Sequence, residues 1–224
     1  MFSLVGFLFC LLFLLNCTLK EHSSSNTRNK INFSNFRQLL TNKSMLCIAF
    51  FMFLFAFFYI QLEVTIPLFV EQTFGSSTPS YIFLLNALIV IFFQIPASRW
   101  ACKEKSQIPI TLSFILFGLS FFLLHFMKHS YTVLFLAIIL FTFAEIMIRI
   151  RFDYDATNID DRLIASALGI MSLSSGFGGI AGSYVSTLLY NKALFGLSSW
   201  QMLIIVSLSV ALISLLPFIK TAKS

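Results

Sequence analysis

Long apolar runs separated by short polar gaps dominate the sequence. A helix needs about 20 apolar residues to cross the roughly 30 Å hydrocarbon core of a bilayer, and seven runs approach or exceed that length. The runs are continuous and do not alternate between apolar and polar positions, so they predict helices rather than the strands of a membrane barrel. The predicted helices cover residues 2–19, 44–69, 81–97, 108–127, 131–150, 163–190 and 198–219.

Composition supports this interpretation and excludes a soluble globular domain. Apolar residues make up 58% of the chain and charged residues only 11%, and the mean hydropathy is +0.90. The few charges lie mostly between the apolar runs, as expected because charges are costly in hydrocarbon. The expected fold class is therefore an all-α membrane protein with one lone transmembrane helix followed by a six-helix transmembrane bundle.

The only long polar stretch divides the chain. We expect a lone transmembrane helix at 1–19, a cytoplasmic linker at 20–43, the bundle at 44–220 and a cytoplasmic tail at 221–224. The first run has neither a basic start nor a small-residue cleavage site, so a retained helix is favoured over a signal peptide.

Basic residues predict the orientation. Thirteen of the 15 lysines and arginines lie in alternate gaps, namely the linker, 99–107, 149–162 and 220–224, and only Lys128 and Lys192 lie in the opposite gaps. Cytoplasmic loops carry this excess of positive charge. We therefore expect a multi-pass protein of the cell (inner) membrane with the linker and C-terminus in the cytoplasm. The same distribution explains the net charge of +6 without nucleic acid.

Motifs for other chemistry are missing. The four cysteines form no CxxC pair and have no partner at metal-ligand spacing, and there is no phosphate-binding loop or hydrolase motif. The acidic stretch at 153–161 resembles a calcium loop, but Asn158 and Ile164 occupy the positions that require Gly and Glu. We expect no enzyme activity, no cofactor and no metal.

The run at 163–190 contains small residues at steps of three and four. Such steps place residues on one face of a helix, where small side chains let another backbone approach closely. The pattern predicts either a structural seam or a surface that slides during transport. The small residues are Ala165, Gly169, Ser172, Ser175, Gly176, Gly179, Gly182 and Ser183.

Polar residues inside the apolar runs are the candidate functional groups, because ionisable groups at membrane depth are costly. The substrate or proton candidates are Gln61, Glu63, Asn86 and Glu145. Glu63 is the best candidate for a proton carrier, a role that requires it to face a cavity. Because it lies close to Pro67, the alternative is that it touches interfacial water.

Two further pairs leave alternatives open. Glu145 and Arg149 have the i, i+4 spacing of an ion pair, which favours a self-neutralised pair near the cytoplasmic end of its helix. Asn86 and Gln94 lie two turns apart on one side of a helix. They could bind substrate or hold a neighbouring helix, and the second role is favoured.

The order of a helix, a cytoplasmic linker and six helices resembles the second part of the major facilitator superfamily, and more narrowly of its multidrug-efflux members. Those proteins have two six-helix halves joined by a cytoplasmic linker. By this resemblance, residues 2–19 correspond to helix six and residues 44–219 to helices seven to twelve, while helices one to five have no counterpart.

Two motifs add to the resemblance. Residues 94–103 are similar to the family's cytoplasmic loop after the eighth helix. Arg99 and Lys103 stand at its basic positions, but Ser98 replaces its Asp. The run at 163–190 matches part of the family's antiporter motif, with Ser183 in place of its Pro. The matching glycines are Gly169, Gly178 and Gly182, expected to serve in helix packing or gating.

The resemblance implies ion-gradient-driven transport, with efflux of a small lipophilic molecule as the favoured activity. The 29 phenylalanines favour an apolar cavity, although many would face lipid. The alternative is a non-transporting membrane protein, either an interaction subunit or the remnant of a broken transporter. Expected partners are the lipid bilayer, a small-molecule substrate, and a missing N-terminal half or a second copy.

Overall fold

The computed structural model describes residues 39–103, 108–127, 130–158, 163–191 and 198–215, which contain helices and turns and no strand. They belong to the second of the chain's two compact units, Phe33–Ser224. The helices are α3 (Lys43–Glu63), α4 (Thr65–Phe74), α5 (Thr78–Lys103), α6 (Ile108–His125), α7 (Tyr131–Thr157), α8 (Ile164–Asn191) and α9 (Ser199–Ser214).

Five helical segments are long and apolar enough to cross a membrane: the pair α3–α4, α5, α6, α7 and α8. Helix α9 is a shorter apolar helix. These helices confirm the prediction of an all-helical, multi-pass membrane protein. The predicted lone helix at 1–19, nearly all of the linker and the C-terminal tail lie outside the described residues.

The first predicted run of the bundle is broken into two helices. It was expected to end at residue 69, but α3 ends at Glu63 and α4 continues to Phe74. Val64 lies between them with φ −116° and ψ −62°. Pro67 explains the break, because proline has no N–H to donate to the carbonyl four residues earlier, at Glu63. Gly75 ends α4 with φ 102°, a conformation that favours glycine.

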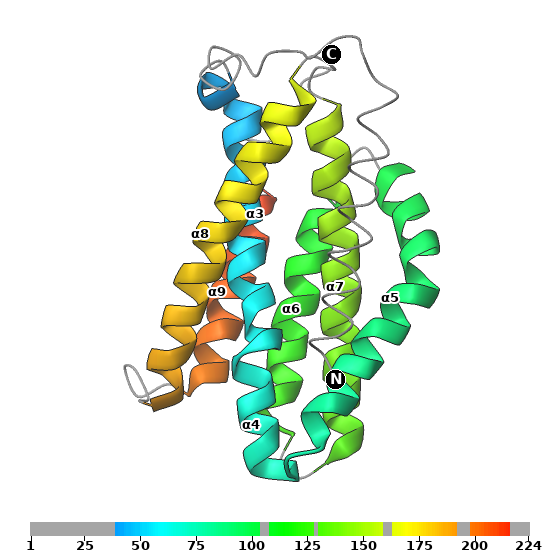
Figure 1. The fold of residues 1–224 in the computed structure, drawn as a ribbon, viewed down its shortest axis with the longest axis vertical. Coiled ribbons are helices and arrows are strands. Elements are labelled where there is room, and N and C mark those ends of the chain that lie inside the picture. Colours follow the sequence, from blue (N-terminus) through cyan, green and yellow to red (C-terminus); the bar gives the residue numbers. More distant parts are fainter. Residues whose placement is uncertain (1–38, 104–107, 128–129, 159–162, 192–197, 216–224) are drawn as a thin grey trace, which may run out of the picture. The chain divides into compact units, whose positions relative to one another are not determined.

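Helices α5 and α7 extend further than the apolar runs. Helix α5 continues through Pro96 to Lys103 and bends along its length (Figure 1). Arg99 and Lys103, predicted to lie in a cytoplasmic loop, are therefore helical, and that prediction is wrong. Helix α7 likewise reaches Thr157 instead of residue 150. Backbone hydrogen bonding continues into the polar ends of both helices.

The neighbours of each helix define how the bundle is arranged. Helix α8 packs along α3, α5 packs along α7, and α6 packs against both α7 and α9 (Figure 1). The start of α3, the end of α5, the end of α7 and the start of α8 lie at one end of the bundle in Figure 1. The basic residues that the structure describes lie toward these ends, namely Lys43, Arg99, Lys103, Arg149 and Arg151.

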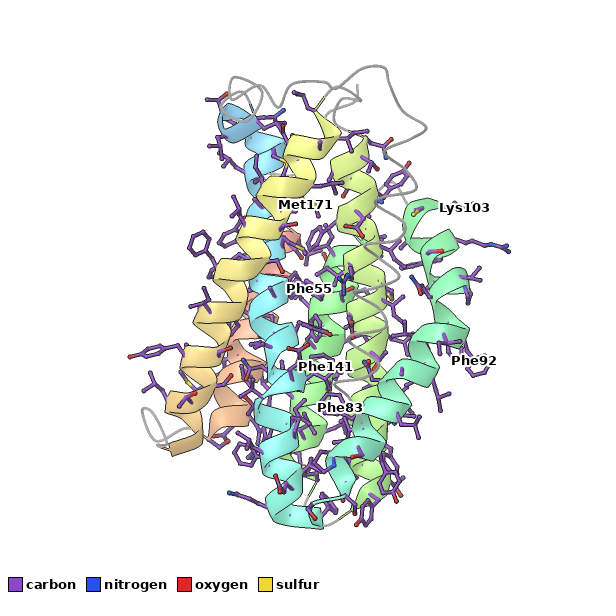
Figure 2. All side chains as sticks on the ribbon, viewed as in Figure 1. Phe55, Phe83, Phe92, Lys103, Phe141 and Met171 are labelled. Carbon is purple, nitrogen blue, oxygen red and sulfur yellow. The ribbon has the colours of Figure 1, made fainter. Side chains whose placement is uncertain are left out.

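Phenylalanines fill the interior between α3, α6 and α7. Phe58 is fully buried and its ring stacks on that of Phe117, with centroids 5.8 Å apart. Phe55 and Phe141 also point into the bundle in Figure 2, whereas Phe92 points away from it and is 70% exposed. The described buried phenylalanines thus form a packed core of edge and stacked contacts.

Candidate functional site

A buried carboxylate joins α5 to α7. Glu145 is only 7% exposed although it lies midway along an apolar helix. The side-chain amide of Asn86 on α5 donates to Glu145 Oε2 at 3.2 Å and to Thr142 Oγ1 at 3.0 Å. Two of the predicted candidates, 59 residues apart in sequence, are therefore brought into direct contact. Thr142 was not predicted, although it precedes Glu145 by one turn.

A cavity of about 150 Å³ opens beside Glu145. Its wall is formed by α5 and α7 and combines charged, polar and aliphatic side chains. The lining residues are Val90, Gln94, Glu145, Ile146, Arg149 and Ile150. None of the phenylalanines in the described residues lines this cavity. The described phenylalanines, expected to line it, lie instead in the core or on the outer surface.

Arg149 does not pair with Glu145 as the spacing suggested. The described residues contain an i, i+4 ion pair elsewhere on α7, between Arg151 Nε and Asp155 Oδ2 at 2.9 Å. Glu145 is turned toward Asn86, whereas Arg149 is exposed. The predicted Glu145–Arg149 ion pair is therefore wrong, because the amide on α5 takes the place of the guanidinium.

Glu63 occupies a different environment. It is exposed at the last residue of α3, next to the break at Val64. It lies near enough to Glu145 for the two charges to repel, and Tyr59 lies within electrostatic range of both carboxylates. Glu63 thus lies within electrostatic range of Glu145 but does not line the cavity, and Glu145 is the carboxylate withdrawn from solvent.

Gln61 belongs to a separate, closed cluster between α3 and α8. It is fully buried, and its amide donates to the carbonyl of Phe57 at 3.1 Å. Its Oε1 accepts from Thr65 Oγ1 at 2.6 Å and lies 2.7 Å from Ser186 Oγ. All of these partners are internal, so the cluster holds the two helices together and leaves little of Gln61 for a substrate.

The predicted glycine face divides into two faces. Gly178 and Gly182 lie against α3, where a Cβ on Gly178 would overlap the carbonyl oxygen of Phe53. Gly169 is exposed, and no atom lies within 4 Å of the place where its Cβ would be. The prediction that the eight small residues form one packed seam is therefore wrong. Steps of three and four residues drift around the helix, so only some of the small residues pack against another helix. Ala165, Ser172 and Gly176 are exposed with Gly169.

Arg151 is a functional candidate that sequence reasoning missed. It is 3% exposed, and its Nη1 donates to the carbonyl of Ala101 at 3.2 Å, which ties the end of α5 to α7. Its guanidinium also lies 5.7 Å from the ring centroid of Tyr154. The i, i+4 spacing to Asp155 was the available signal. Arg99 and Lys103, the predicted motif residues nearby, are both exposed.

In the described part of the chain, no group of three or more His, Cys, Asp or Glu side chains could hold a metal ion.

Comparison with known proteins gives one positive result. The model of the Major Facilitator Superfamily matches residues 1–152 of the 224. No curated protein matches the chain.

Proposed function

The chain belongs to the major facilitator superfamily, and from this premise we propose that it transports a small lipophilic molecule across a membrane, driven by an ion gradient and in the direction of efflux. The family is one of transporters that are typically not enzymes, in agreement with the sequence prediction. We further propose that α3 to α9 correspond to helices seven to twelve of the family.

The buried position of Glu145 beside the cavity is the observation that best supports this proposal. A carboxylate in an apolar span is costly to keep buried, so it is retained where it binds an ion, a proton or a substrate. Glu145 lines a cavity and is held by a single amide donor from the neighbouring helix. A neutral amide stabilises the charged carboxylate less than a full ion pair would. The site is therefore suited to exchanging one occupant for another during a transport cycle.

The broken span α3–α4 also supports a transport role. In many transporters, discontinuous helices bring polar groups to the substrate site. Here the break follows Glu63 and lies close enough to the α5–α7 site for Glu63 and Glu145 to interact electrostatically.

Export of lipophilic dyes from cells tests the proposal. Cells that express the chain should extrude at least one dye of a panel faster than cells with an empty vector. An ionophore that collapses the ion gradient should abolish the difference. Extrusion that persists without the gradient would rule out ion coupling, and extrusion of no dye would favour the second candidate below.

The second candidate is a non-transporting membrane protein, and the position of the cavity is the observation that favours it. The cavity is lined by α5 and α7 alone, whereas transporters of this fold bind substrate between two halves. Of the most apolar part of α5, only 11% of the residues are buried in the bundle, against 56% for α6 and α7. Transport would therefore require a missing half or a second copy, and co-purification of two differently tagged copies would detect the latter.

A further inference from the structure

Two opposite charges line the same cavity without forming an ion pair in the described chain. Glu145 and Arg149 lie one turn apart on α7 and both line the cavity. Residues at this spacing are neighbours on a helix surface. The nearby pair Arg151–Asp155 has the same spacing and closes to 2.9 Å. No such contact joins Glu145 to Arg149 in the described chain.

Some polar side chains around the cavity have a hydrogen-bond partner within the described residues and others do not. Glu145 already accepts from Asn86, but neither Arg149 nor Gln94 makes a hydrogen bond or ion pair within the described residues, and both are exposed. Arg149 interacts with Glu145 and with Asp153 only at longer range, as Glu63 does with Glu145. The guanidinium and the amide are therefore available to an anionic group in the cavity.

The size and lining of the cavity restrict the uncharged part of the ligand. The remaining wall consists of the aliphatic residues Val90, Ile146 and Ile150. The volume of about 150 Å³ is below the roughly 300–1,000 Å³ of sites for drug-sized molecules. A compact ligand with one short branched apolar group fits this space.

We propose that the cavity binds a small zwitterion, with its cationic group at Glu145 and its anionic group at Arg149 and Gln94. This inference rests on the proposed transport function, but it assigns the same site a compact zwitterion in place of the lipophilic molecule that the family resemblance favours. A ligand with only a positive charge would meet Arg149, and one with only a negative charge would meet Glu145. Each would leave one protein charge facing a like charge or no partner, which is how a site discriminates against the wrong ligand.

Three ligands of nearly equal shape test the charge requirement. Leucine carries both charges, leucinamide only the positive one and 4-methylpentanoate only the negative one. Calorimetric titration into the purified full chain in detergent should show that leucine binds at least tenfold more tightly than either analogue. Equal or tighter binding of either analogue, or no binding of leucine to folded protein, would overturn the proposal.

Two variants separate the two charges. Glu145→Gln should remove the preference for leucine over 4-methylpentanoate, and Arg149→Gln should remove the preference over leucinamide. Glu71→Gln and Arg99→Gln, which change exposed charges away from the cavity lining, should leave both preferences intact. The assignment is wrong if either control has the effect expected of the cavity variants.

Binding and transport can fail separately. A chain that binds leucine with these preferences but exports nothing would refute the transport function and retain the zwitterion site. A chain that exports a dye but binds the three ligands alike would retain transport and refute the zwitterion site.

Discussion

Adding one methyl group at Gly178 should force α3 and α8 apart. A Cβ there would overlap the carbonyl oxygen of Phe53, lie 2.9 Å from its carbonyl carbon and 3.0 Å from Ala56 Cβ. Two of the three atoms belong to the backbone, so no side-chain rotation relieves the overlap. Even Gly178→Ala, which the sequence alone suggests is a mild change, should therefore be disruptive.

Gly176→Ala is the matched control. Gly176 lies two residues away on the same helix, is exposed, and has no atom within 4 Å of the place where its Cβ would be. Both substitutions gain the same helix propensity, up to about 1 kcal/mol. The difference between the two variants therefore isolates the steric cost, which is about 1–3 kcal/mol for overpacking.

Thermal unfolding in detergent measures this difference. At about 2–4 °C per kcal/mol for a chain of this size, Gly178→Ala should unfold roughly 2–12 °C below Gly176→Ala. Equal unfolding temperatures would refute the packing of α8 on α3. A lower temperature for Gly176→Ala would mean that the opposite face of α8 is the packed one.

Other changes test the remaining contacts. Gly182→Leu should cost at least as much stability as Gly178→Ala, because its Cβ meets Ile60 and the Phe57 backbone, whereas Leu173→Phe on the exposed face should be nearly silent. Gln61→Leu should lower the unfolding free energy by about 0.6–2 kcal/mol, as for other hydrogen bonds between membrane helices, and an unchanged stability would mean the cluster is not closed. Arg151→Met should lower the unfolding free energy by roughly 3 kcal/mol, because it leaves Asp155 unpaired, whereas Arg99→Met should lower it much less. Equal losses would contradict the proposal that Arg151 ties α5 to α7. A membrane-impermeant thiol reagent should label Cys102 only after cells are permeabilised, and labelling in intact cells would reverse the predicted orientation.

The sequence predicted the spans because apolar length is a local property, but it misplaced several helix ends. The predictions for α5 and α7 stopped where polar residues began, just before Arg99 and just before Arg151. The backbone hydrogen bonds that define a helix continue regardless of side-chain polarity, so α5 reaches Lys103 and α7 reaches Thr157.

The site was predicted as a set of residues and not as an arrangement. Asn86 and Glu145 were both candidates, but their contact depends on which face of α5 meets α7, and no local pattern encodes this. The same reason explains the small residues of α8: steps of three and four drift around a helix, and only the position of α3 selects Gly178 and Gly182 over Gly169.

Ion coupling through Glu145 is the central claim, and its most direct test compares two kinds of transport by the full chain in proteoliposomes. With an imposed ion gradient, Glu145→Gln should abolish uphill accumulation of an exported dye while downhill exchange of the same dye continues. Glu63→Gln should retain more uphill transport, because Glu63 is exposed. Uphill accumulation by Glu145→Gln at the wild-type rate would contradict the claim.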